Sequence, residues 1–537
     1  MIRRILWLFP LAGAALWLWA QAVSAPPSSP LAYFPPGAML ALDARDAGQL
    51  LREWNGSSVK RDWLASDAYR QFAVSSLALR LQEAQQEFGD ASKTPVDMTL
   101  AGQLAGDRTA FALYNPSDLE FLLVTRMPEA RFAATLLGRR RAALSPRNAA
   151  GTPYFVSTAP GSRRVVAFAV RGEWLVVGTT EALVAESLQR MAANSNNGLT
   201  AEEWYSRAAQ AAGNPGELRM ASNVEALLTS PHFRSYWIQH NRAELAPFLS
   251  AVSDLDRQPA AWTERRVLIR KQAAAPPAVD SALWAPLLRA VPANAGLYRA
   301  WLQPEPAFAA QLLTQKFFDP APGGGPVAQS APDISLPGEA GGESDWENSI
   351  DEAPFVPGDT RPDSARFAQW LGRAQLTGLA HVQGTRESAD TVWLQQDIGI
   401  VLTRRGNWNA AEVQSELAHL GPATVQSAVD GNRLLLANSP ALLAAMRAGA
   451  NAAVPAANVR FIGGFRHAAE RTRFPRYMAH IDQPTYVPPP QGEQREPRFL
   501  NDVAGSLSHT LRGVTEQTVA TADAADRQTQ TILYRMQ

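Results

Sequence analysis

The feature that most constrains the fold is a pattern that occurs twice along the 537 residues, at a spacing of about 260. Val170–Val177, with Glu181–Leu183 behind it, matches Val429–Leu436 with Pro440–Leu442, and no gap is needed. Further segments recur in the same order: Pro36–Leu51 as Pro292–Leu313, Leu122–Arg126 as Ile400–Arg404, Arg219–Tyr236 as Arg460–Tyr477, Phe248–Val252 as Phe499–Val503, and Val267–Gln272 as Ile532–Gln537. The pattern predicts two tandem copies of one folding unit. The alternative is two unrelated domains that share common strand–turn–helix motifs.

The predicted copies occupy residues 31–272 and 288–537, with a linker at Ala273–Ala278 between them. Each copy combines short antiparallel hairpins with helices, so we expect an α+β fold. The second copy carries two insertions, 319–363, rich in glycine, proline and acidic residues, and 483–496, with three consecutive prolines. Neither can bury enough apolar surface to fold alone, and we expect loops or disorder there.

One hairpin with a following helix is predicted in both copies. In the first copy, Val165–Val177 consists of two apolar runs on either side of a glycine-containing turn, which is typical of a β-hairpin. Thr179 or Thr180 is then the expected N-cap of a helix, because a hydroxyl oxygen can accept a hydrogen bond from a free N–H of the first turn. Asn438 or Ser439 is the corresponding cap in the second copy.

Earlier parts of the first copy predict further elements of the same kinds. Phe111–Tyr114 and Phe121–Val124 form a second candidate hairpin around an Asn-Pro turn. The range Pro128–Arg141 is the expected next helix, since proline suits the first helical position. Asp62 is the expected N-cap of a long helix over Trp63–Phe88, whose spaced apolar residues indicate partial burial.

The N-terminus has the pattern of an export segment. Arg3 and Arg4 precede the apolar run Ile5–Val23, and no further Lys or Arg occurs before Arg45, so the charge asymmetry places the body outside the cytoplasm. The run is long enough to span a bilayer, which favours an uncleaved anchor in the bacterial inner membrane with the body in the periplasm. Because Val23–Ala25 also has the small-x-small form of a cleavage site, a cleaved first segment of 25 residues and a soluble periplasmic protein remain the alternative.

Composition excludes several function classes. Lys plus Arg and Asp plus Glu are both 50, so no overall field attracts the chain to nucleic acid. Cysteine is absent, which excludes disulfides, thiolate nucleophiles and cysteine-ligated metal sites. A hydrophobic content of 46% nevertheless provides for an apolar core in each copy.

The histidines form no recognisable metal or catalytic motif. None belongs to the His-Glu-x-x-His pattern of zinc hydrolases. The nearest approach is His467 with Glu470, which lacks an evident third ligand, and we expect both to be ordinary polar residues. The histidines are His232, His240, His381, His419, His467, His480 and His509. We predict no metal ion and no cofactor.

Three other segments carry residue types used in sites. Gly505–His509 contains serine and histidine, but their adjacency does not create a catalytic triad. The acidic cluster from Asp345 to Glu352 lacks the spacing of an EF-hand loop; a solvated linker, a calcium site and a docking segment with apolar anchors all remain open. Arg139–Arg141 is most simply a solvated helix end.

Three motifs together resemble uncharacterised bacterial envelope proteins classed only as domains of unknown function. They are the Pro35–Ala38 opening, the Gly172–Val177 hairpin with its capped helix, and Ser506–Ser508 near the end. The resemblance implies a membrane-anchored periplasmic protein and brings no catalytic residues with it.

These observations favour a membrane-tethered, non-enzymatic protein that binds another envelope protein. A periplasmic hydrolase with an unrecognised site is one alternative, in which the regions around Asp43, Arg219 or Arg460 line a pocket. A carrier of an apolar ligand is the other, and it requires a continuous apolar cavity.

Overall fold

The computed structural model describes residues 29–230, 245–318, 364–387, 394–420, 425–449, 458–470 and 513–537, apart from six single positions within these ranges. The chain divides into two compact units. Unit 1 comprises the residues up to Gly48 together with Glu87–Glu202, and unit 2 comprises Gln49–Gln86 together with Glu203–Gln537. Both units combine helices with antiparallel strands, so the predicted α+β class is confirmed.

Unit 1 contains an antiparallel sheet in the order β1-β2-β3-β7-β6-β5-β4. Its strands are β1 (Leu40–Ala44), β2 (Thr109–Asn115), β3 (Glu120–Arg126), β4 (Ser145–Ala149), β5 (Thr152–Thr158), β6 (Val165–Arg171) and β7 (Trp174–Gly178). Its helices are η1 (Pro30–Tyr33), α7 (Met98–Leu104), α8 (Glu129–Ala133), α9 (Leu136–Arg140), η2 (Arg141–Ala143), α10 (Glu181–Ala193) and η3 (Leu199–Ala201). Phe34, Leu122 and Phe168 are fully buried in its core.

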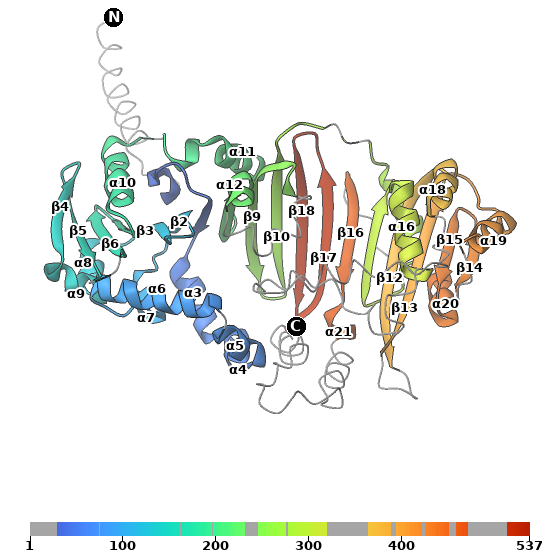
Figure 1. Cartoon of the computed structure of the whole chain (residues 1–537), viewed down its shortest axis with the longest axis horizontal. Coiled ribbons are helices and arrows are strands. Elements are labelled where there is room, and N and C mark those ends of the chain that lie inside the picture. Colours follow the sequence, from blue (N-terminus) through green and yellow to red (C-terminus); the bar gives the residue numbers. More distant parts are fainter. Residues whose placement is uncertain are drawn as a thin grey trace, which may run out of the picture. The chain divides into compact units, whose positions relative to one another are not determined.

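Unit 2 contains a longer antiparallel sheet in the order β8-β9-β10-β18-β17-β16-β11-β12-β13-β15-β14 (Figure 1). Its strands are β8 (Leu218–Asn223), β9 (Phe248–Gln258), β10 (Ala261–Arg270), β11 (Leu297–Leu302), β12 (Leu376–Glu387), β13 (Leu394–Arg404), β14 (Gln426–Asp430), β15 (Arg433–Ala437), β16 (Val459–Phe465), β17 (Val514–Asp523) and β18 (Arg527–Met536). Several of these have 10 to 12 residues, so the prediction of uniformly short hairpins is wrong for this unit.

The helices of unit 2 lie on both faces of this sheet. They are α11 (Glu203–Ala212), α12 (Val224–Thr229), η4 (Ser281–Leu283), α15 (Trp284–Arg289), α16 (Pro306–Phe317), α18 (Ser364–Arg373), α19 (Ala410–Ala418), α20 (Pro440–Ala448) and α21 (His467–Glu470). The segment before Gln86 adds α4 (Ser58–Ala65) and α5 (Asp67–Ala73), while α3 (Ala47–Gly56) and α6 (Ser76–Ser92) each cross the boundary between the units in sequence.

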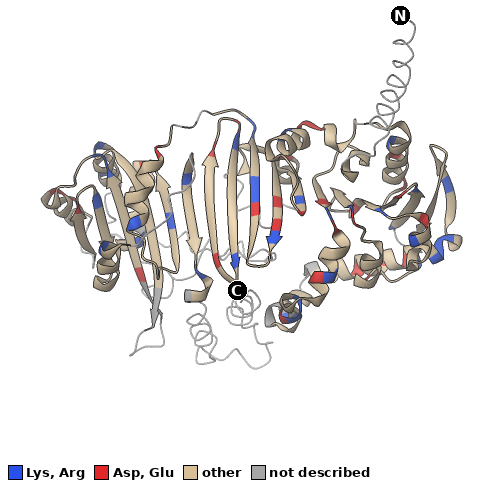
Figure 2. Ribbon diagram, turned by 180° about the vertical axis from the view of Figure 1, so that it is seen from behind, with Lys and Arg blue, Asp and Glu red and all other residues tan. Residues whose placement is uncertain are grey.

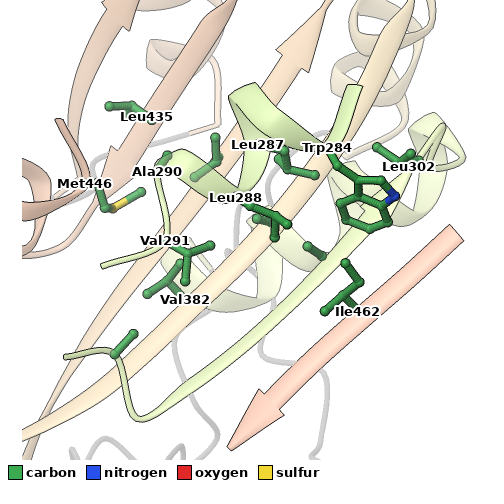
Figure 3. Close-up of a cluster of buried hydrophobic side chains, with 14 of the residues drawn as sticks. Trp284, Leu287, Leu288, Ala290, Val291, Leu302, Val382, Leu435, Met446 and Ile462 are labelled. Atoms are coloured by element: carbon green, nitrogen blue, oxygen red, sulfur yellow. The ribbon is translucent and has the colours of Figure 1, made fainter. Parts of the chain in front are cut away.

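Two apolar cores occupy opposite faces of the strands from β11 to β15. Trp284 and its neighbours on α15 pack with Val401 and Leu435 on one face (Figure 3). Helices α16, α18 and α19 pack with Ile400 and Leu434 on the other face. Since neighbouring strand residues point to opposite faces, continuous apolar runs such as that of β15 are buried from both sides. The indole Nε1 of Trp284 donates a hydrogen bond to the carbonyl oxygen of Val459 at 3.1 Å, which fixes the ring in its core.

The strand pairings repeat between the first and second parts of the chain. The neighbours β2-β3-β7-β6 have the same connectivity as β12-β13-β15-β14, and β8-β9-β10 the same as β16-β17-β18. The turns between β6 and β7 and between β14 and β15 each begin with a glycine of positive φ, Gly172 at 60° and Gly431 at 59°. Glycine takes this left-handed conformation without steric cost, and it is the residue that a tight II′ hairpin turn requires.

One of the sequence matches does not follow this correspondence. Phe248 begins β9, and the strand with the same pairings is β17, which begins at Val514. The segment Phe499–Val503, which the sequence comparison aligned with Phe248, lies before β17 and outside the described residues. The match of Phe248–Val252 with Phe499–Val503 therefore falls on residues that the structure does not describe.

The predicted hairpins are confirmed, and so are the caps Thr180 and Ser439. The predicted helix over Trp63–Phe88 is wrong, because the segment forms the three helices α4, α5 and α6. Ser57 caps α4, and the Ser66 hydroxyl accepts a hydrogen bond from the N–H of Tyr69 at 3.0 Å, which starts a new helix after α4 ends.

The helix predicted over Pro128–Arg141 is likewise divided, into α8 and α9, and Pro128 stands just before α8. The Thr135 hydroxyl caps α9 by accepting a hydrogen bond from the N–H of Gly138 at 3.0 Å. A hydroxyl in the middle of an otherwise helical sequence thus ends one helix and begins another at both places.

Within the described ranges, no helix has both the length and the apolar character required to cross a membrane. The predicted export segment and the predicted insertions at 319–363 and 483–496 lie outside those ranges.

Candidate functional site

The residues that the hydrolase alternative named lie on three strands. Asp43 lies on β1 of unit 1, where it accepts a hydrogen bond from the Ser29 hydroxyl at 2.6 Å. Arg219 lies on β8 and Arg460 on β16 of unit 2. Four strands separate β8 from β16 in the sheet, so at ~4.8 Å per strand these two arginines are roughly 24 Å apart.

Arg219 instead belongs to a buried ion pair. Its Nε and one terminal nitrogen each donate to Asp254 of β9 at 2.7 Å, and both side chains are almost fully buried. The backbone N–H of Gly216 donates to the same carboxylate at 3.1 Å, while Arg219 also donates to the carbonyl oxygen of Gly213 at 2.8 Å. The pair ties the loop after α11 to β8 and β9, so its role is structural.

Removing one partner of this pair leaves an uncompensated buried charge. We expect Asp254→Asn to lower the free energy of unfolding by about 3–5 kcal/mol. The control is Asp107→Asn, which breaks an exposed ion pair with Arg126 and is expected to cost less than about 1 kcal/mol. Urea titration followed by circular dichroism measures both, and equal losses would contradict the structural role assigned to Asp254.

The other sequence candidates fall into two groups. Arg139 and Arg140 lie in the last turn of α9 and Arg141 follows it, as predicted for a helix end. His467 begins α21 with its ring against Phe465, at a centroid distance of 4.5 Å. The side chain of Glu470, the segment Gly505–His509 and the acidic cluster of the 319–363 insertion lie outside what the structure describes. Within the described residues, no three His, Asp or Glu side chains are grouped as metal ligands.

His381 is a buried polar residue that the sequence analysis did not single out. It lies on β12 between Arg299 of β11 and Ile400 of β13, and its Nε2 has no hydrogen-bond partner among the described residues. Burial, followed by the charges of Lys316 and Arg299, lowers the pKa of His381 to about 3. The ring is therefore neutral at physiological pH.

The lowered pKa of His381 makes the protein acid-sensitive. Because the folded-state pKa lies below the ordinary value of 6.5, the unfolded chain binds the proton more tightly, and stability falls as pH drops from about 6.5 towards 3. Between pH 7 and pH 4.5 this group accounts for a loss of roughly 2–3 kcal/mol.

Between pH 7 and pH 4.5, we expect the free energy of unfolding to fall by roughly 2–3 kcal/mol less in His381→Leu than in the wild type. The control is Ile400→Val, at a buried apolar residue directly opposite His381 on β13, which removes no titratable group and is expected to cost the same free energy at both pH values. Urea titrations at both pH values measure the difference. Parallel pH profiles for the wild type and His381→Leu would contradict the burial of a neutral His381.

A cluster of polar side chains joins β10 to β18, strands that lie far apart in sequence. The Glu264 carboxylate accepts hydrogen bonds from the Ser253 hydroxyl at 2.6 Å, the Tyr534 hydroxyl at 3.1 Å and the Arg266 guanidinium at 2.5 Å. Trp262 is directly opposite Tyr534, and Arg266 is directly opposite both Ser253 and Gln530. Side chains directly opposite one another lie on the same face of a sheet.

We call this face the central sheet surface, defined by Ser253, Trp262, Glu264, Arg266, Gln530 and Tyr534. Figure 2 shows acidic and basic residues on neighbouring strands here, and in Figures 1 and 2 no described helix crosses the middle of β10, β18 and β17. Arg266 is exposed, while Trp262 and Tyr534 are half-buried. Arg257 stacks over the Trp262 ring at 5.9 Å from its centroid.

The electrostatics of this cluster suit binding better than acid–base chemistry. Burial alone raises the pKa of Glu264, but the hydrogen bonds from Arg266 and Ser253 outweigh it and hold the pKa below its usual range. Burial raises the pKa of Tyr534 to about 12, and the Glu264 charge adds to this effect. Neither group has a pKa near neutrality, which a general acid or base requires.

Sequence reasoning missed this surface because its residues come from strands about 270 positions apart. The available signal was the content of β-branched and aromatic residues along 262–269 and 529–534. That content identifies two strands. It does not say that the two strands pair.

Comparisons with known proteins add no assignment. No family model matches the chain, and no curated protein matches it. Two solved structures of a protein called TP0453 are similar to the chain at a TM-score of 0.25. Crystal form IV has 12% identity and the match covers 46% of this chain and 83% of that chain. Crystal form III has 14% identity and the match covers 50% of this chain and 89% of that chain. At this TM-score the likeness carries no argument about fold or function.

Proposed function

We propose that this protein is a membrane-tethered component of the bacterial envelope that binds another envelope protein through the central sheet surface. The observation that supports binding is the composition of that surface. Trp262, Arg266 and Tyr534 are of the residue types that are enriched where proteins associate. Glu264 already satisfies its hydrogen bonds within the protein, so a partner can cover the cluster without leaving a buried carboxylate unpaired.

We also propose that the body consists of two copies of one α+β unit. The collinear sequence matches support this, and so does the repeated connectivity of the strands. Gly172 and Gly431 also occupy the same position of the corresponding hairpin turns, with φ of 60° and 59°.

The tether is the apolar N-terminal run after Arg3 and Arg4. Its length and the absence of further positive charge before Arg45 support an inner-membrane anchor with the body in the periplasm. Neither the hydrolase nor the apolar carrier gains a supporting observation from the described residues.

Site-specific photocrosslinking in cells tests the binding proposal. A photoreactive phenylalanine analogue at Arg266, whose side chain is 44% exposed, is expected to give one discrete crosslinked product in the inner-membrane fraction. The control is the same substitution at Arg147 on β4, whose side chain is 54% exposed, and no product is expected there. Absence of a product at Arg266, or the same products at both positions, would count against the proposal.

A further inference from the structure

Among the residues that the structure describes, the large exposed apolar side chains are concentrated in one helical segment. The large hydrophobic residues with the most exposure include Trp54, Leu64, Phe72, Val74, Leu79 and Leu81, all between α3 and α6. Elsewhere in the described residues only Met98, Met220 and Phe308 belong to this class. Single exposed hydrophobic residues are ordinary, but a group within 28 consecutive positions indicates an interaction surface.

Contacts between aromatic rings join α4 and α5 into one patch. Trp63 and Tyr69 meet edge to face at a centroid distance of 6.0 Å, and Tyr69 and Phe72 lie 6.5 Å apart. Leu64 is exposed next to Trp63 on α4. The Ser66 hydroxyl donates to the carbonyl oxygen of Trp63 at 2.6 Å while it caps α5, so the two helices hold a fixed relation.

These helices receive little stabilisation from the protein core. They have 8 and 7 residues, and isolated helices shorter than about 12–15 residues are marginal in water. None of the residues of α4 is buried. Hydroxyl caps begin the helices, and Leu64 and Phe72 remain exposed in the described part of the chain.

The charge of α4 and α5 indicates what kind of surface their apolar side chains meet. Helices α4 and α5 have three basic residues, Lys60, Arg61 and Arg70, against two acidic ones, Asp62 and Asp67, a net charge of +1 in a chain whose total is zero. Helices that lie in the headgroup region of a bilayer combine Trp, Phe and Leu with Lys and Arg in this way.

We propose that α4 and α5 bind the surface of an anionic phospholipid bilayer. The inference rests on the proposed function only in placing the body beside a membrane. Trp63, Leu64 and Phe72 enter the acyl boundary, while Lys60 and Arg61 remain at the phosphates. The segment is then a second point of membrane contact, separate from the N-terminal tether.

The absence of cysteine makes a single labelled site straightforward. The full-length chain, with Phe72→Cys carrying an environment-sensitive dye, is reconstituted into vesicles of phosphatidylcholine and phosphatidylglycerol at 7:3 that contain spin-labelled quencher lipid. Phe308→Cys on α16 is the matched control, because Phe72 and Phe308 are both 38% exposed.

We expect quenching of the dye at position 72 to exceed quenching at position 308 by about fivefold. In pure phosphatidylcholine, which has no net charge, quenching at position 72 is expected to fall to the control level. The same fall is expected in 0.5 M NaCl, because salt screens the attraction to anionic headgroups. The additional exchange Leu64→Ser is expected to reduce quenching at position 72 while leaving the circular dichroism spectrum unchanged. Equal quenching at both positions would overturn the proposal. If the dye at position 72 is shielded from water without lipid and the protein has twice the monomer mass, a second copy of the chain covers the patch. That result would also overturn the proposal.

The same samples separate this proposal from the tether. Vesicle flotation in 0.5 M NaCl reports the N-terminal anchor, whose apolar insertion does not depend on salt. A chain that floats in high salt but shows no excess quenching at position 72 refutes the α4–α5 proposal alone. A chain that fails to float in high salt but is quenched at position 72 in low salt refutes the tether alone.

Discussion

The pairing of β10 with β18 is the constraint on which the rest of unit 2 depends. The two strands are antiparallel over nine matched positions, from Ala261 opposite Arg535 to Ile269 opposite Arg527. No connection local in sequence places them together, since Glu264 and Tyr534 are 270 positions apart. Among the described strands, the backbone hydrogen bonds of this pair join the sheet on the β8 side to the sheet on the β14 side.

Side-chain interactions beyond the backbone ladder stabilise the same junction. Glu264 collects donors from three residues on β9, β10 and β18, and Arg270 forms an ion pair with Asp523 at 2.8 Å. The backbone N–H of Arg270 donates to the carbonyl oxygen of Asp526 at 2.9 Å. A cross-strand network of this kind fixes register, and register decides which side chains share the central sheet surface. The proposed binding surface is thus a consequence of the strand pairing.

Local features of the fold were predictable from the sequence, because they depend on a few adjacent residues. Gly172 with its flanking apolar runs determines a hairpin, and Thr180 and Ser439 determine helix starts. Ser66 and Thr135 show where such reasoning fails, since a hydroxyl in a helical pattern can either face solvent or divide the helix. The buried pair of Arg219 with Asp254, the neutral His381 and the Glu264 cluster depend on strand neighbours distant in sequence. Periodicity cannot identify those neighbours.

Engineered cysteines test the central junction most directly, because the chain contains none of its own. Thr263 of β10 is directly opposite Leu533 of β18. The account predicts that the double variant Thr263→Cys with Leu533→Cys forms an intramolecular disulfide in the oxidised protein. The variant Thr263→Cys with Thr529→Cys, displaced by four residues or about 13 Å along β18, is predicted to remain reduced. Mass spectrometry of both proteins decides the matter: a disulfide in the first alone supports the pairing, and its absence there, or equal formation in both, contradicts it.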